Sequence, residues 1–145
     1  MKNLFLLLLS LFIAVGCVAQ NNSKLKPKAS TSLAYLKNYN EKYPNEVKLF
    51  SKPQFVNRVK ALTGTRYSLL KKYWDVESPI EIAGDNFIAY ACQAHNCDVT
   101  NFMIIYDFKN DKMYVGIREE EVVKTYSENG TPIPPRLDEW VKNNH

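Results

Sequence analysis

The cysteine and histidine side chains of this sequence are concentrated in one hexapeptide, Cys92-Gln93-Ala94-His95-Asn96-Cys97. His95 lies between the two cysteines, and the only other histidine is the C-terminal residue, His145. If the two thiols form a disulfide, the segment closes into a small ring with an imidazole at its tip. Such a ring suits insertion into a cleft on another molecule. In the alternative interpretation, the disulfide is only a stabilising link and His95 has no role.

A metal site and a catalytic cysteine are the other chemistries that these residue types allow. A structural zinc needs four ligands, whereas the hexapeptide offers three, and the spare candidates Asp85, Asp98 and His145 match no zinc spacing. A nucleophilic cysteine needs a free thiolate beside an imidazole, which a disulfide removes. The sequence also has no G-x-S-x-G, phosphate-binding glycine loop or H-E-x-x-H motif. We therefore expect no enzymatic activity, no metal and no cofactor.

The N-terminal residues indicate the environment that the thiols meet. Lys2 precedes an apolar run from Leu4 to Val15, which is short for a bilayer span and has the layout of a secretory signal. Two cleavage sites compete, a lipobox at Cys17, whose thiol would receive lipid, and an ordinary site before Gln20. Both predict export to the periplasm or cell envelope, with a lipid anchor in the first case. Disulfides form in such oxidising compartments.

The number of cysteines bears on the disulfide pairing, and the charge bears on the class of partner. Cys17 is either lipidated or removed with the signal, which leaves Cys92 and Cys97 as a pair. The formal charge is +4, with lysine and arginine interspersed among acidic residues. No basic face with interleaved aromatic residues is visible, which argues against nucleic-acid binding. A homodimer is compatible with the sequence.

The chain divides into three parts by composition. Residues 1–19 are predicted to be the signal peptide, 20–31 a flexible polar linker, and 32–145 a single domain. In the domain, helical periodicity comes first. It predicts a partial helix over 32–43, a short extended piece at 47–50, a helix capped by Ser51 that ends at Gly64, and a short helix capped by Thr65.

Alternating patterns follow from Pro79 onward. They predict strands at 80–83, 87–92, 101–108, 113–118 and 122–126, with a final helix over 136–143. This order of elements indicates an α+β fold, an antiparallel β-meander sheet with helices packed on one face. The hexapeptide then forms a projecting loop between two strands, where binding residues are often found.

The residues around this loop resemble the inhibitor of vertebrate lysozyme (Ivy-type) family. The resemblance covers roughly residues 84 to 118 and rests on the Cys-x-x-His-x-Cys segment, the strand Phe102–Asp107 and the later Met113-Tyr114-Val115-Gly116. The family pattern inside the loop is Cys-Lys-Pro-His-Asp-Cys. This chain has Gln93, Ala94 and Asn96 instead, so the loop lacks the stiffness of the proline and the charge of the aspartate.

The resemblance implies an exported inhibitor that places the loop in the active-site cleft of c-type lysozyme or of a related peptidoglycan-cleaving enzyme. His95 would meet the catalytic carboxyls, Cys92–Cys97 would clamp the loop, and Gln93, Ala94 and Asn96 would also contact the target. C-type lysozymes are strongly basic, so Glu119, Glu120 and Glu121 would favour their approach if they lie near the loop. A non-inhibitory envelope binding module of the same fold and an inhibitor of an endogenous lytic transglycosylase are the alternatives.

Overall fold

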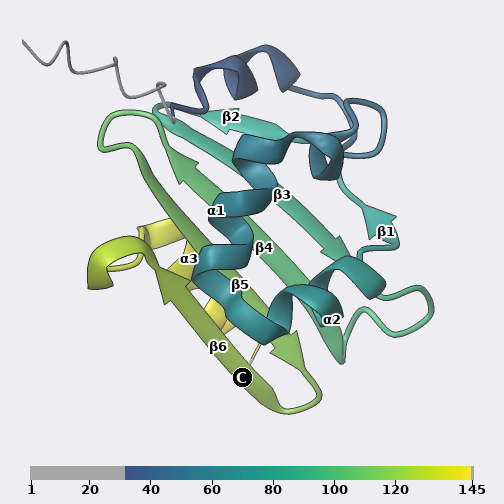
Figure 1. Cartoon of the computed structure of the whole chain (residues 1–145). Coiled ribbons are helices and arrows are strands. Elements are labelled where there is room, and N and C mark those ends of the chain that lie inside the picture. The colour runs from purple at the N-terminus through teal and green to yellow at the C-terminus, as the bar shows by residue number, and fades with distance from the viewer. Residues whose placement is uncertain (1–31, 145) are drawn as a thin grey trace, which may run out of the picture. The chain divides into compact units, whose positions relative to one another are not determined.

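An antiparallel sheet organises residues 32–144, the part of the chain that the computed structural model describes (Figure 1). The expected signal peptide (1–19) and linker (20–31), with Cys17, lie outside the described residues, as does His145. The strands are β1 (Val76–Glu77), β2 (Glu81–Ala83), β3 (Asn86–Cys92), β4 (Thr100–Asp107), β5 (Lys112–Glu119) and β6 (Val122–Ser127). Their order is β1-β3-β4-β5-β6, and β2 also pairs with β3.

Within residues 32–144, three α-helices accompany the sheet: α1 (Pro53–Thr63), α2 (Tyr67–Lys72) and α3 (Pro135–Lys142). Short 3₁₀ helices occupy Ala34–Tyr39, Leu49–Ser51, Gly64–Arg66 and Glu128–Gly130. Within the described residues, no helix has the length and apolar character that crossing a bilayer would require. The α+β class with an antiparallel meander is confirmed.

The main core lies between the sheet and the helices α1 and α2, which cover one face of it (Figure 1). Because side chains alternate along a strand, every second residue of β3, β4 and β5 enters this core. The strand residues are Phe87, Ala89, Ala91, Phe102, Ile104, Tyr106, Met113, Val115 and Ile117. They meet Phe55 and Val59 of α1 and Leu70 of α2, all fully buried.

The opposite face of the sheet is covered by α3, a feature that the sequence analysis did not anticipate (Figure 1). Leu137 and Trp140 of α3 pack on the intervening residues Ile88, Met103, Ile105 and Tyr114. Gly116 makes this close approach possible, because a Cβ atom there would lie 2.5 Å from Cζ3 of Trp140. The central strand β4 is consequently buried on both faces.

The strand predictions agree with the structure to within about two residues, whereas three details before α2 were wrong. Residues 47–50 are not extended, because Lys48 has a φ of 51° and the N–H of Leu49 donates to the carbonyl of Pro44 at 2.9 Å. Lys52, not Ser51, occupies the N-cap position of α1, and Arg66, not Thr65, that of α2. Gly64 ends α1 as expected, with a φ of 56°.

Hydrogen bonds from Arg58 join α1 to the end of the sheet that carries the β4–β5 turn. The guanidinium donates to Glu128 through Nε at 2.9 Å and to Asp111 through Nη1 at 2.5 Å. Glu128 also accepts the backbone N–H of Met113, and Asp111 accepts the hydroxyl of Tyr106 at 2.7 Å. Burial alone would raise the pKa of Asp111, but the hydrogen bonds from Arg58 and Tyr106 outweigh it and lower that pKa.

Gly116→Ala tests the contact between α3 and the sheet. The added methyl group overlaps Trp140, so we expect a loss of about 1–3 kcal/mol in the free energy of unfolding, the usual cost of overpacking a core. Urea denaturation measures this. In a Trp140→Leu background the same substitution should cost less, because the overlapping ring is gone and only Cδ1 of Leu137, at 2.9 Å, still crowds the added methyl group. Equal costs in both backgrounds would contradict the steric explanation.

The lowered pKa of Asp111 predicts a pH dependence of stability. The carboxylate contributes fully above its ordinary pKa of 3.8, and this contribution is lost as pH falls through the lower pKa of the folded state. Asp111→Asn suits the test, because asparagine tolerates the φ of 49° at this position. Between pH 5 and pH 2, roughly the range over which such groups titrate, the variant should lose less stability than the wild type in urea denaturation. Identical pH slopes would contradict this.

Candidate target-binding loop

A disulfide closes the loop between β3 and β4. Cys92 is the last residue of β3 and is bonded to Cys97, with the two Cα atoms 4.9 Å apart. The strand register places Cys92 opposite Asn101 of β4. One more backbone bond, from the N–H of Gln93 to the carbonyl of Thr100 at 3.0 Å, continues this pairing into the loop. The base of the loop is therefore an extension of the central sheet.

A tight turn presents His95 at the tip of the loop. The N–H of Asn96 donates to the carbonyl of Gln93 at 3.0 Å, which encloses Ala94 and His95. His95 has a φ of 61°, whereas Ala94 does not have a positive φ, the combination found in a type II turn. Histidine is among the non-glycine residues enriched in this left-handed region. Both Ala94 and His95 are exposed, so the imidazole is presented outward rather than toward the core.

The two polar departures from the family pattern contact each other. The side-chain amide of Asn96 donates to Oε1 of Gln93 at 3.2 Å. Where the pattern has lysine and aspartate, which could form an ion pair, this chain has a neutral pair of amides. The turn around His95 therefore keeps a side-chain link without any charge of its own.

Asp75, which lies between α2 and β1, supports the loop from outside. Its Oδ2 accepts the N–H of Ala94 at 3.3 Å, and its own N–H donates to the carbonyl of Cys92 at 3.2 Å. Strand β1 follows at once and pairs Val76 with Cys92. Asp75 thus contacts both the base and the tip of the loop.

Asn101 supports the other side of the loop. It is 2 % exposed, and its Nδ2 donates to the carbonyl of Cys97 at 2.9 Å and to Oδ1 of Asn144 at 2.8 Å. Asn144 follows α3, and its Oδ1 also accepts Nη1 of Arg118 at 3.2 Å. The loop is consequently tied to the segment that follows α3 as well as to the sheet.

Acidic side chains lie on both sides of the loop. Asp75 and Asp98 are exposed beside it, and the β5–β6 turn with Glu120 and Glu121 lies at the same end of the sheet, since Thr100 pairs with Glu119. Glu119 itself is paired with Arg66 at 2.5 Å. Burial, and then the charge of Asp98, raise the pKa of the Tyr90 hydroxyl. Acidic side chains thus gather around the loop, with Arg118, which pairs with Asn101, as a cation at the same end of the sheet.

The structure brings the predicted site residues together in one loop, from Cys92 to Cys97. It places Asp85 at the opposite end of β3, by the β2–β3 turn, and Asp98 just after the disulfide. Over residues 32–144, no three histidine, cysteine, aspartate or glutamate side chains are grouped as metal ligands would be. Sequence reasoning missed Asp75, Asn101 and Asn144, which support the loop through contacts that no local sequence signal reveals.

A family model described as inhibitor of vertebrate lysozyme (Ivy) matches residues 54–145 of this chain. The chain belongs to the Ivy family. The match includes the disulfide-closed loop and every strand of the sheet. No curated protein and no solved structure matches the chain significantly.

Membership of the Ivy family points to lysozyme inhibition and to a lysozyme as the partner. The family is one of inhibitors, which is compatible with a protein that has no catalytic activity. Ivy inhibitors are typically extracytoplasmic, a setting in which the Cys92–Cys97 disulfide would form.

Asn101→Ala tests the support of the loop. The carbonyl of Cys97 and the side chain of Asn144 would lose their shared partner, so we expect a loss of about 1–3 kcal/mol in stability. The amide of Thr100, which is bonded to the carbonyl of Asn96, should exchange hydrogen faster. Asn110→Ala, in the turn at the other end of β4, is the matched control and should leave that amide unchanged. If the Thr100 amide exchanges at an unchanged rate in Asn101→Ala, the side chain of Asn101 does not hold the loop in place.

Proposed function

We propose that this chain is an exported inhibitor of c-type lysozyme that inserts its disulfide-closed loop into the active-site cleft of the enzyme. His95 would lie between the two catalytic carboxyls, with Gln93, Ala94 and Asn96 against the walls of the cleft. The observation that carries the proposal is the exposed imidazole at the tip of a turn closed by Cys92–Cys97. Family membership supplies the class of target.

The chemistry of the target explains why an imidazole is suitable. A retaining glycosidase holds two carboxyl groups about 5 Å apart, one protonated and one ionised. An imidazole offers one N–H donor and one acceptor when neutral, and two donors when protonated. His95 can therefore form hydrogen bonds with both carboxyl groups while it occupies the space that the sugar needs.

The loop reaches the target already ordered. Immobilising a flexible side chain on binding costs roughly 0.5–1.5 kcal/mol, and ordering a mobile loop adds to this cost. Here the disulfide, the turn bond from Asn96 to Gln93 and the contact with Asp75 hold the segment before binding. These bonds compensate for the proline that the family pattern has at the position of Ala94.

The acidic residues beside the loop favour a basic partner. Asp75, Asp98, Glu120 and Glu121 are exposed around it, although the formal charge of the whole chain is +4. At physiological ionic strength, charges act over about 8 Å. The acids nearest to the loop therefore count for more in docking to a basic lysozyme than the distant lysines do.

Export completes the proposal. Residues 1–19 would be removed as a signal peptide, residues 20–31 would act as a linker, and residues 32–145 would form the inhibitor domain in the periplasm or envelope. If the lipobox is used, Cys17 would carry the lipid and the linker would separate the domain from the membrane. The support for this is the apolar N-terminal run and the disulfide, which needs an oxidising compartment.

His95→Asn tests the role of the imidazole. Asparagine also accepts a positive φ, so the turn should persist while the ring is lost, which His95→Ala would not guarantee. We expect the inhibition constant for c-type lysozyme on cell-wall substrate to rise at least about tenfold, equivalent to 1.4 kcal/mol.

Lys109→Ala, in the turn at the opposite end of the sheet, is the matched control and should inhibit like the wild type. Reduction of the disulfide with a thiol should weaken the wild-type inhibitor as well. An unchanged inhibition constant in His95→Asn, with the disulfide intact by mass spectrometry, would refute the proposed role.

A further inference from the structure

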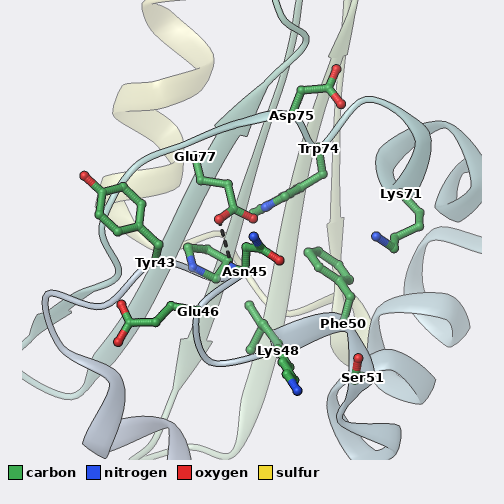
Figure 2. Close-up of a pocket in the computed structure, with 12 residues that line it drawn as sticks. Tyr43, Asn45, Glu46, Lys48, Phe50, Ser51, Lys71, Trp74, Asp75 and Glu77 are labelled. Carbon is green, nitrogen blue, oxygen red and sulfur yellow. Dashed lines mark hydrogen bonds between the residues drawn. The ribbon is translucent and has the colours of Figure 1, made fainter.

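A groove of about 720 Å³ lies beside the loop and has no part in the proposed insertion. One wall is the segment 43–51 (Figure 2). The other wall consists of Lys71 in α2, Glu77 in β1, and Trp74 and Asp75 in the connection between these two elements. We propose that this groove is a second binding site, which takes a neutral, N-acetylated oligosaccharide of the kind found in cell-wall glycan.

Trp74 supplies the first argument, a buried donor without an acceptor. The side chain is 8 % exposed, and its Nε1–H has no hydrogen-bond partner among the described residues. In Figure 2 the indole extends into the groove toward Glu77. Leaving a buried N–H without an acceptor is unfavourable. The carbonyl of an acetamido group, entering the groove with a small shift of its lining, would satisfy this donor.

The remaining lining suits a sugar. Tyr43 is 48 % exposed at the mouth, so its ring is available for the apolar face of a sugar ring. Phe50 is half-buried against Trp74, with ring centroids 5.0 Å apart, and the ammonium group of Lys71 lies over its ring. Asn45 is exposed and keeps its side-chain amide available, because its bond to Glu77 uses the backbone N–H. Sugar hydroxyl groups need both donors and acceptors of this kind.

The charges of the groove favour a neutral ligand. Carboxylates come from Glu46, Asp75 and Glu77, and ammonium groups from Lys48 and Lys71. Opposite charges line the same space, so neither a polyanion nor a polycation is matched throughout. A ligand with hydroxyl and amide groups can bond with both kinds of side chain.

The position of the groove points to glycan among neutral ligands. Asp75 lines the groove and also accepts the N–H of Ala94, next to His95. If the loop enters a lysozyme cleft, the groove lies close to the enzyme that cleaves N-acetylated glycan. This choice of ligand rests on the proposed function, whereas the groove and its unpartnered donor do not.

The test uses chitotetraose, a neutral oligomer of N-acetylglucosamine, in the absence of any lysozyme. The chain has two tryptophans, so an NMR spectrum of ¹⁵N-labelled protein contains two indole N–H signals, and Trp140→Phe assigns them. Trp140 is a matched reference, because its Nε1–H is also buried and unpartnered but lines a different cavity. Millimolar chitotetraose should shift the signal of Trp74 and leave that of Trp140 in place.

Two variants connect the shift to the groove. Trp74→Phe removes the donor and keeps an aromatic ring on Phe102, and it should raise the dissociation constant about fivefold, the factor equivalent to one ordinary hydrogen bond. Asn45→Ala changes only an exposed side chain and should weaken binding without affecting the fold. Trp140→Phe should bind like the wild type. Maltotetraose, which lacks acetamido groups, should bind more weakly than chitotetraose.

The outcomes separate this proposal from the inhibitor proposal. A Trp74 shift in protein that inhibits no lysozyme would support the groove and refute the proposed function. Active inhibitor with no Trp74 shift, or with a shift only at Trp140, would overturn the groove proposal alone. If only the addition of lysozyme shifts the Trp74 signal, the groove is a protein contact and the glycan site is refuted.

Discussion

The short crossing from β3 to β4 is the constraint on which the loop depends. The strand register fixes Cys92 opposite Asn101, and the disulfide holds Cys97 with its Cα atom 4.9 Å from that of Cys92. The chain must reverse within this span, so it forms a tight turn in which His95 takes a φ of 61°. The conformation of the tip therefore follows from the sheet and the cross-link. A histidine can occupy that position at little cost, and the same geometry presents its ring to solvent.

The sequence predicts most strands from their alternation and predicts the α+β class, but alternation alone does not tell which face of the sheet α3 covers. The run Phe102–Tyr106 is apolar at every position, which is typical of a strand buried on both faces. Gly116 within a strand is likewise a signal of close approach by another element, here Trp140. The segment 47–50 misleads because its apolar side chains are buried in a turn rather than in a strand.

Of the candidate site, the sequence predicts the cysteine and histidine residues that carry its chemistry, but not the residues that support them. Cysteine and histidine are rare in this chain, so their spacing stands out. The supports are common residue types whose role depends on tertiary contacts. Asp75 meets Ala94 across 19 positions, and Asn101 meets Asn144 across 43. Gln93 and Asn96 were predicted from the sequence as site residues, but the hydrogen bond between their side chains was not.

The tip of the loop lies outside the apolar core, and this separation determines which substitutions the fold tolerates there. The apolar core is buried between the sheet and its helices, and none of its members lies between Gln93 and Val99. Substitutions at the exposed positions 94 and 95 therefore alter the surface offered to a partner with little effect on packing, provided that residue 95 tolerates a positive φ. Surface substitutions of this kind usually change stability by less than about 0.5 kcal/mol. Under the proposed function the tip can thus vary with the target, while the disulfide, Asp75 and Asn101 preserve the shape in which any new tip residue is presented.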